Sequence, residues 1–223
     1  EFMARKIVSR SPHREVGVVN AAWLLDHPVE HESHLERRFI IAALACPVVT
    51  DIVHQPFTMP LAYGEGDEKY TPDFKITFAD GGVVIVEVKP KVFISKHADK
   101  LRRAEEQMRA DGLRFVVVTD EQIDGQALAA RAMLLLRYGR LRFTDDEALD
   151  CLQALRAACD GDTTVRELVA SGLSEPLIWN LVARHECRVP ADFSVEPNQV
   201  ITIQPVEGEN HAFFKSWFGL AQG

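Results

Sequence analysis

The chain has 223 residues, a formal net charge of −8 and 47% hydrophobic residues, which is enough apolar material for one large domain or two modest ones. It has neither the uninterrupted apolar run of a membrane span nor the apolar N-terminal stretch of a signal peptide, so we expect a cytoplasmic protein with no membrane partner. Glu1 and Phe2, which precede Met3, are interpreted as a cloning scar.

The negative charge is unevenly distributed. Residues 1–144 contain 20 Lys+Arg and 20 Asp+Glu, whereas residues 145–223 contain 5 and 13. The acidic C-terminal part favours a protein partner over DNA. The neutral first part can still bind phosphate through local basic patches.

Cysteine and histidine spacing does not indicate a metal site. The four cysteines form no Cys-x-x-Cys pair, and the histidines at 27, 31 and 34 lack further ligands at zinc-site spacing. We expect reduced, mostly buried thiols and no structural zinc.

The first expected segment, residues 1–14, consists of the scar and a basic arm. Such arms are often disordered, but this one could lie along a DNA backbone through its cations, Arg5, Lys6, Arg10 and Arg14. A main domain over residues 15–143 follows. Ser33 and Glu36 form a capping-box pattern that predicts a helix ending near Pro47, and residues 48–59 contain strand material.

A hairpin is predicted between the runs 74–78 and 83–88, joined by Ala-Asp-Gly-Gly. If the turn centres on Gly81, Asp73 lies opposite Lys89. Because strand side chains alternate between faces, Asp73, Glu87 and Lys89 would share one face within cross-strand or diagonal reach. Two carboxylates supply hard oxygen ligands for Mg²⁺, and the ammonium could orient a water or stabilise phosphate charge.

Each half of this pattern has a plainer explanation. Glu-x-Lys is usually a solvated cross-strand pair, and Pro-Asp is a common turn or strand-entry dipeptide. A one-residue slip would also move Asp73 to the other face. The combination on two arms of one hairpin favours a site.

After Pro90 the sequence predicts a helix closed by Gly112, with a polar side that is strongly basic. Its candidate DNA-binding residues are Lys91, Lys96, Lys100 and Arg103. A buried strand at 114–119 and a helix at about 125–137 complete a mixed α/β core with helices on both faces.

A second unit is expected over residues 144–205. Caps at Thr163 or Thr164 and at Ser174, followed by strand material with a turn at Pro197-Asn198, indicate a small, mainly helical winged-helix-like domain. It has few basic residues, so protein docking has at least equal weight with DNA binding. The aromatic tail, residues 206–223, is expected to pack onto the body, with a docking peptide as the alternative.

Five ordered motifs resemble the TnsA-type transposon endonuclease subunit, a branch of the restriction-endonuclease-like PD-(D/E)xK nucleases. They are Glu32-Ser33-His34-Leu35-Glu36, Gln55-Pro56-Phe57, Tyr70-Thr71-Pro72-Asp73-Phe74, Val86-Glu87-Val88-Lys89-Pro90 and residues 115–119. The likeness covers residues 5 to about 140 well and the C-terminal part more loosely. It implies a restriction-endonuclease-like mixed sheet flanked by helices.

The resemblance also implies an activity: Mg²⁺-dependent hydrolysis of the 5′, non-transferred DNA strand at transposon ends. By resemblance, Glu36, Asp73 and Glu87, with Val88, would hold one or two Mg²⁺ ions, for which Mn²⁺ is expected to substitute, and Lys89 would serve the attacking water. The capping-box position of Glu36 explains it without catalysis, yet we favour participation at the metal. Glu32 and Gln55 are supporting or merely structural candidates.

Partners follow from the same resemblance. They are DNA at transposon ends, a transposase subunit that we expect to supply end specificity, and a regulatory ATPase bound through the acidic C-terminal part. Two alternatives remain open: a stand-alone restriction or repair nuclease of this fold, and a catalytically idle assembly adaptor.

Overall fold

The computed structural model describes residues 16–61, 68–158, 163–203 and 208–221. Its centre is a four-stranded mixed sheet in the order β3-β6-β7-β8. The strands are β3 (Val49–His54), β6 (Phe74–Phe78), β7 (Val83–Lys89) and β8 (Arg114–Thr119). β3, β6 and β7 pair antiparallel and β8 joins β7 in parallel, so the predicted mixed α/β core is present.

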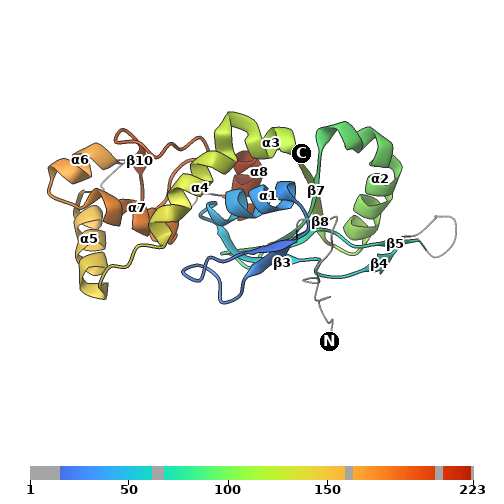
Figure 1. Cartoon of the computed structure of the whole chain (residues 1–223), viewed down its shortest axis with the longest axis horizontal. Helices are drawn as coiled ribbons and strands as arrows, with labels where there is room; N and C mark the ends of the chain where they lie inside the picture. Colours follow the sequence, from blue (N-terminus) through green and yellow to red (C-terminus); the bar gives the residue numbers. More distant parts are fainter. Residues whose placement is uncertain (1–15, 62–67, 159–162, 204–207, 222–223) are drawn as a thin grey trace.

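Helices cover both faces of the sheet, as the sequence predicts (Figure 1). α1 (His34–Leu44) packs on one face, where Phe39 and Ile40 join the alternate strand residues Phe74, Ile76 and Val86 in the main core. α2 (Ile94–Ala110) packs on the other face, where Ala104 and Met108 meet Ile85 and Tyr70. The alternation of side chains along β7 therefore separates two apolar layers.

Shorter elements frame this sheet. Two small hairpins pair β1 (Gly17–Val19) with β2 (Val29–His31) and β4 (Met59–Pro60) with β5 (Lys69–Tyr70). The 3-10 turn η1 (Lys91–Phe93) leads into α2. After β8 come α3 (Asp120–Asp124), the 3-10 turn η2 (Gly125–Ala127) and α4 (Leu128–Gly139), which packs against α1. α4 thus starts three residues after the predicted start at 125 and ends two residues after the predicted end at 137.

The hairpin register corrects one expectation. Phe74 pairs with Val86 and Lys75 with Ile85, so the hairpin centres on Asp80 and not on Gly81, and continuing the register places Asp73 opposite Glu87. Gly81 adopts φ +80 within the turn, a left-handed conformation that glycine accepts without strain. The partner of Asp73 is therefore two residues away from the expected one, Lys89. A shift of two residues leaves every side chain on its predicted face, so Asp73, Glu87 and Lys89 still share one face.

The C-terminal part contains α5 (Asp145–Ala158), β9 (Thr163–Thr164), α6 (Val165–Ala170), α7 (Glu175–Ala183) and β10 (Val200–Ile201), with β9 and β10 antiparallel. Thr164 caps α6 in a reciprocal capping box with Glu167. The helical segments expected from the caps are therefore present. The winged-helix assignment itself stays a prediction.

The last helix packs against the core that contains α1 and the central sheet. α8 (Asn210–Trp217) lies behind α1 and α4 in Figure 1, and Trp217 Nε1 donates a hydrogen bond to the Ala42 carbonyl at 2.9 Å. Phe218 stacks on Phe39 and Phe214 packs against Phe78. The tail residues 210–218 are thus packed onto the body, which was the favoured expectation.

Two further expectations can be compared with the structure. Cys46, Cys151 and Cys187 are buried thiols outside any disulfide, as predicted, while Cys159 lies outside the described residues. None of the helices in the described part of the chain combines the length and apolar character needed to cross a bilayer.

Candidate active site

Asp73, Glu87 and Lys89 meet at the end of β7 on the face that carries α2. Lys89 Nζ lies 2.6 Å from Glu87 Oε1, and the Asp73 carboxylate accepts a hydrogen bond from the Val88 backbone N–H at 2.8 Å. All three line one cavity of about 290 Å³, together with Tyr70, Thr71 and three residues of α2, His97, Lys100 and Leu101. The convergence inferred from strand parity is therefore present in the structure.

Burial sets the electrostatics of this cavity. The pKa of the Asp73 carboxyl is raised well above its usual range, first by desolvation and then by the negative charge of Glu87, against which the Val88 hydrogen bond acts. Two acids held close together in a dry environment favour an added proton or cation. Asp73 and Glu87 therefore have the donor chemistry of a site for a hard divalent cation.

Tyr70 is a site residue to which the sequence motif assigns no role. Its hydroxyl donates a hydrogen bond to Glu87 Oε2 at 2.7 Å, while Lys89 contacts the other oxygen. Burial and the Glu87 charge raise the pKa of Tyr70, so it stays a donor. Sequence spacing alone could not reveal the contact between Tyr70 and Glu87, because it depends on how the β4–β5 hairpin packs against α2.

Glu36 lies on the α1 side of the sheet. Its Oε2 accepts from the Glu32 N–H at 2.7 Å, its Oε1 accepts from the Ser33 hydroxyl at 2.9 Å, and His54 Nε2 lies 3.5 Å away, too long for a strong hydrogen bond. Burial alone would raise the pKa of Glu36, but these contacts lower it. The capping role is thus present, and the charge of Glu36 also acts on the Asp73 pKa.

Gln55 supports the site through its backbone. It adopts φ +44, and its N–H donates to the Asp73 carbonyl at 2.8 Å. A non-glycine residue in the left-handed region costs free energy that surrounding contacts must offset, and such residues cluster at functional sites. Glu32, the other supporting candidate, contributes its N–H to Glu36.

The participation of Glu36 at the metal stays a prediction. In the described residues, no group of three or more His, Cys, Asp or Glu side chains is arranged to hold a metal ion. Asp73 and Glu87 fit a divalent cation by their chemistry, but Glu36 does not complete a three-carboxylate cluster with them in this structure.

The predicted DNA-binding cations of α2 and η1 are mostly engaged with acids. Lys91 pairs with Glu121 at 3.1 Å, Lys100 with Glu68 at 3.2 Å, and Arg103 with Glu68 at 2.7 Å and with Asp99 at 2.9 Å. Lys96 is exposed and has no ion pair with the described residues. Arg5, Lys6, Arg10 and Arg14 lie outside the described residues.

Comparison with protein families finds a match to part of this chain. Residues 46–120 match the family model described as TnsA-like endonuclease N terminal. The resemblance to TnsA-type endonucleases is confirmed over this segment. The matched segment contains Asp73, Glu87 and Lys89 but neither Glu36 nor the part beyond β8. A search among curated proteins found no match.

Together, the sequence match and the geometry indicate a nuclease of the transposase type. The match identifies a segment like a TnsA endonuclease domain. The structure shows the mixed α/β core and places the two carboxylates beside Lys89. A TnsA-like domain implies DNA and a transposase as partners in general.

Proposed function

We propose that this chain is the endonuclease subunit of a heteromeric transposase, hydrolysing the 5′, non-transferred strand at transposon ends during excision. The observation that carries the proposal is the meeting of Asp73, Glu87 and Lys89 in one cavity within the segment that matches the TnsA-like domain. The alternatives are a stand-alone nuclease of the same fold and an idle assembly adaptor. An adaptor would have no need for a buried acid pair and a lysine at this position.

The residues that would hold Mg²⁺ are Asp73, Glu87 and the backbone carbonyl of Val88, and Glu36 of α1 is the further candidate ligand. Once bound, Mg²⁺ would activate water and neutralise charge on the phosphate, and Mn²⁺ should substitute. The protein's own groups do the positioning. Val88 N–H fixes the Asp73 carboxylate, and Tyr70 fixes the Glu87 carboxylate.

Lys89 would contribute charge at the scissile phosphate. Its side chain is 24% exposed, whereas that of Glu87 is 6% exposed, so the ammonium reaches the cavity while its counter-ion stays buried. An ammonium held in this way can orient a water or stabilise the developing negative charge without reorganising. We assign it that role and not metal binding.

The acidic C-terminal part would contact the regulatory ATPase. α5 carries Asp145, Asp146 and Glu147 in its first turn, all exposed, and the excess negative charge of the chain lies beyond residue 144. Such a surface repels a DNA backbone and favours a basic protein surface. End specificity would come from the transposase subunit.

The test is a reconstituted excision assay in which both strands are resolved on a sequencing gel. Asp73→Ala and Lys89→Ala should each lower 5′-strand cleavage by about 10²–10³-fold while leaving transferred-strand cleavage by the partner intact. Asp111→Ala, an exposed acid after the far end of α2, is the matched control and should be unaffected. Unchanged cleavage in both site variants would remove the assignment.

A further inference from the structure

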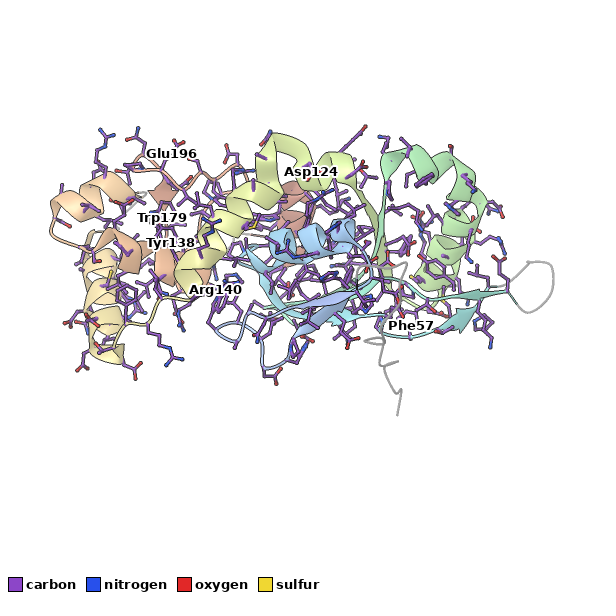
Figure 2. The ribbon with its side chains drawn as sticks, in the orientation of Figure 1. Phe57, Asp124, Tyr138, Arg140, Trp179 and Glu196 are labelled. Atoms are coloured by element: carbon purple, nitrogen blue, oxygen red, sulfur yellow. The ribbon has the colours of Figure 1, made fainter. Side chains whose placement is uncertain are left out.

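The structure contains a groove between α1 and α4 that carries a cluster of arginines. One helix contributes Arg37, Ile41 and Leu44, a stripe at helical spacing, and the other contributes Met133, Leu136, Arg137 and Arg140. The chain after β1, from Val19 to Trp23, forms a third wall, and the cavity measures about 290 Å³. Figure 2 labels Arg140 at the end of α4, away from the α2 side of the molecule.

The three arginines of this groove are exposed and have no counter-ion among the described residues. Neither a hydrogen bond nor an ion pair to any described residue involves the side chains of Arg37, Arg137 and Arg140, and no acidic residue of the described ranges lines the groove. This is unusual in a chain with a net charge of −8. The neighbouring Arg38 pairs with Asp124, and most cations of α2 pair with acids.

The shape of the groove fits an extended polyanion. Seven residues separate Arg37 from Leu44, and seven separate Met133 from Arg140, so each stripe spans about 10 Å at 1.5 Å per residue. Measured along the axis of a duplex, that length corresponds to about three phosphates of one strand. Arginine guanidinium groups bind phosphate oxygens in a bidentate way, which favours this ligand over a lone metal or neutral molecule.

One wall of the groove is joined to α4 by a close contact. Trp23 packs against Gly139 so closely that a Cβ added at Gly139 would lie 2.3 Å from Trp23 Nε1. This contact fixes the segment after β1 to the end of α4. The apolar stems of Arg37, Arg137 and Arg140 can lie along that surface while their charged ends face solvent.

We propose that the α1–α4 groove binds the sugar-phosphate backbone of duplex DNA, through Arg37, Arg137 and Arg140. Arg37 follows Glu36 in the first turn of α1, so the groove begins beside the residue that the proposed function treats as a further candidate ligand. The inference rests on the proposed function for its choice of DNA as the ligand. It concerns binding, however, and requires no hydrolysis.

The experiment measures binding of the full chain to a fluorescently labelled duplex of about 30 base pairs, in EDTA, over a series of salt concentrations. Wild type is compared with the triple variant Arg37→Gln/Arg137→Gln/Arg140→Gln and with the control Arg102→Gln/Arg109→Gln, whose arginines are ion-paired on α2. Melting temperatures establish that both variants fold, and the three single Arg→Gln variants are used if the triple variant does not.

The triple variant should bind at least tenfold more weakly at low salt. Its plot of log affinity against log salt should be shallower by about 2.7, or about 0.9 for each lost phosphate contact. The control should match wild type. Equal affinity and slope in wild type and the triple variant, or an equal loss in the control, would overturn the proposal, as would tighter binding of a polyglutamate peptide than of the duplex.

This outcome is separable from that of the proposed function. Loss of binding in the triple variant without any measurable strand cleavage in wild type would support the groove and count against the nuclease assignment. Normal binding in the triple variant with active wild type would do the reverse.

Discussion

At the scale of single residues, Asp73 places a carboxyl where ionisation is costly for the free protein. Its pKa is raised by desolvation and by Glu87, whereas an unfolded aspartate ionises near pH 4. The folded state therefore holds a proton that the unfolded state releases. Stability from this group is highest below that pH and falls as the pH rises through the raised pKa.

Asp73→Asn should therefore stabilise the metal-free protein near neutral pH while abolishing cleavage. Asparagine keeps an acceptor for the Val88 N–H and removes the buried charge, so we expect a rise in Tm of a few degrees in EDTA, about 1 kcal/mol. Added Mg²⁺ should raise the Tm of wild type and leave the variant unchanged. A variant that melts below wild type in EDTA would contradict this account of the site.

Tyr70→Phe tests whether the Tyr70 hydroxyl positions Glu87. The variant removes a 2.7 Å hydrogen bond and keeps the buried ring. We expect activity to fall about tenfold, with a higher Mg²⁺ concentration needed for half-maximal rate. If Tyr70 had only a packing role, the Mg²⁺ dependence of Tyr70→Phe would match that of wild type. Phe115→Leu, which alters a ring packed on Tyr70, is the control for packing.

At the scale of elements, α4 is held to the segment after β1 by a close approach that only glycine permits. In Gly139→Ala, the added methyl would meet the Trp23 ring, at 2.3 Å from Nε1, and something must shift. We expect a loss of about 1–3 kcal/mol in the free energy of unfolding, measured in urea. Gly125→Ala, with no heavy atom within 4 Å, is the control and should change stability little.

His185 links α7 to the end of α1 and gives the protein a predictable pH dependence. Its Nε2–H donates to the Leu44 carbonyl at 3.0 Å, and burial lowers the pKa of the imidazole to about 4. An unfolded histidine ionises near pH 6.5, so below that pH the unfolded state binds the extra proton. The contribution of the neutral imidazole to the free energy of unfolding is fully present above about pH 6.5. It is lost as the pH falls towards 4, and the loss is about 3 kcal/mol.

His185→Gln should flatten stability between pH 6.5 and 4, because glutamine can donate to Leu44 and does not titrate. The measurement is the urea midpoint of both proteins at several pH values. Equal slopes in wild type and His185→Gln would show that the buried imidazole is not the cause.

Local patterns predicted much of this architecture because their physical causes are local. The Ser33 cap, the Thr164 capping box and the alternation along β6 and β7 each depend on neighbouring residues. The exact hairpin register was not predictable, because the turn could centre on Gly81 or one residue earlier. The Tyr70 contact with Glu87 and the pairing of Lys100 with Glu68 depend on which distant segments pack together, and sequence spacing does not encode that.

At the scale of the whole molecule, one apolar core continues from the sheet into the C-terminal part. Phe39 and Ile76 belong to the same cluster of buried residues as Trp179, Phe193 and Phe214. The aromatic residues at α8 pack on α1 and β6, so this C-terminal helix covers part of the core formed by earlier elements. Shared burial of this kind couples the unfolding of the two parts.

Thermal unfolding should therefore show one cooperative transition by calorimetry. Phe214→Ala should lower its Tm by an amount that corresponds to about 3–5 kcal/mol, because removal of this fully buried ring leaves a cavity in the core that both parts share. Phe213→Ala, one position along α8 and only partly buried, should cost much less. Two separate transitions in wild type, with Phe214→Ala shifting only one, would show that the parts unfold independently.

The central claim is that Asp73 and Glu87 jointly hold a divalent cation beside Lys89. The most direct measurement is an anomalous difference map from crystals of the protein soaked in Mn²⁺. The account predicts a peak within about 2–2.6 Å of oxygens from both carboxylates, absent in Asp73→Asn. A peak elsewhere, or a fully soaked crystal with none between Asp73 and Glu87, would contradict it.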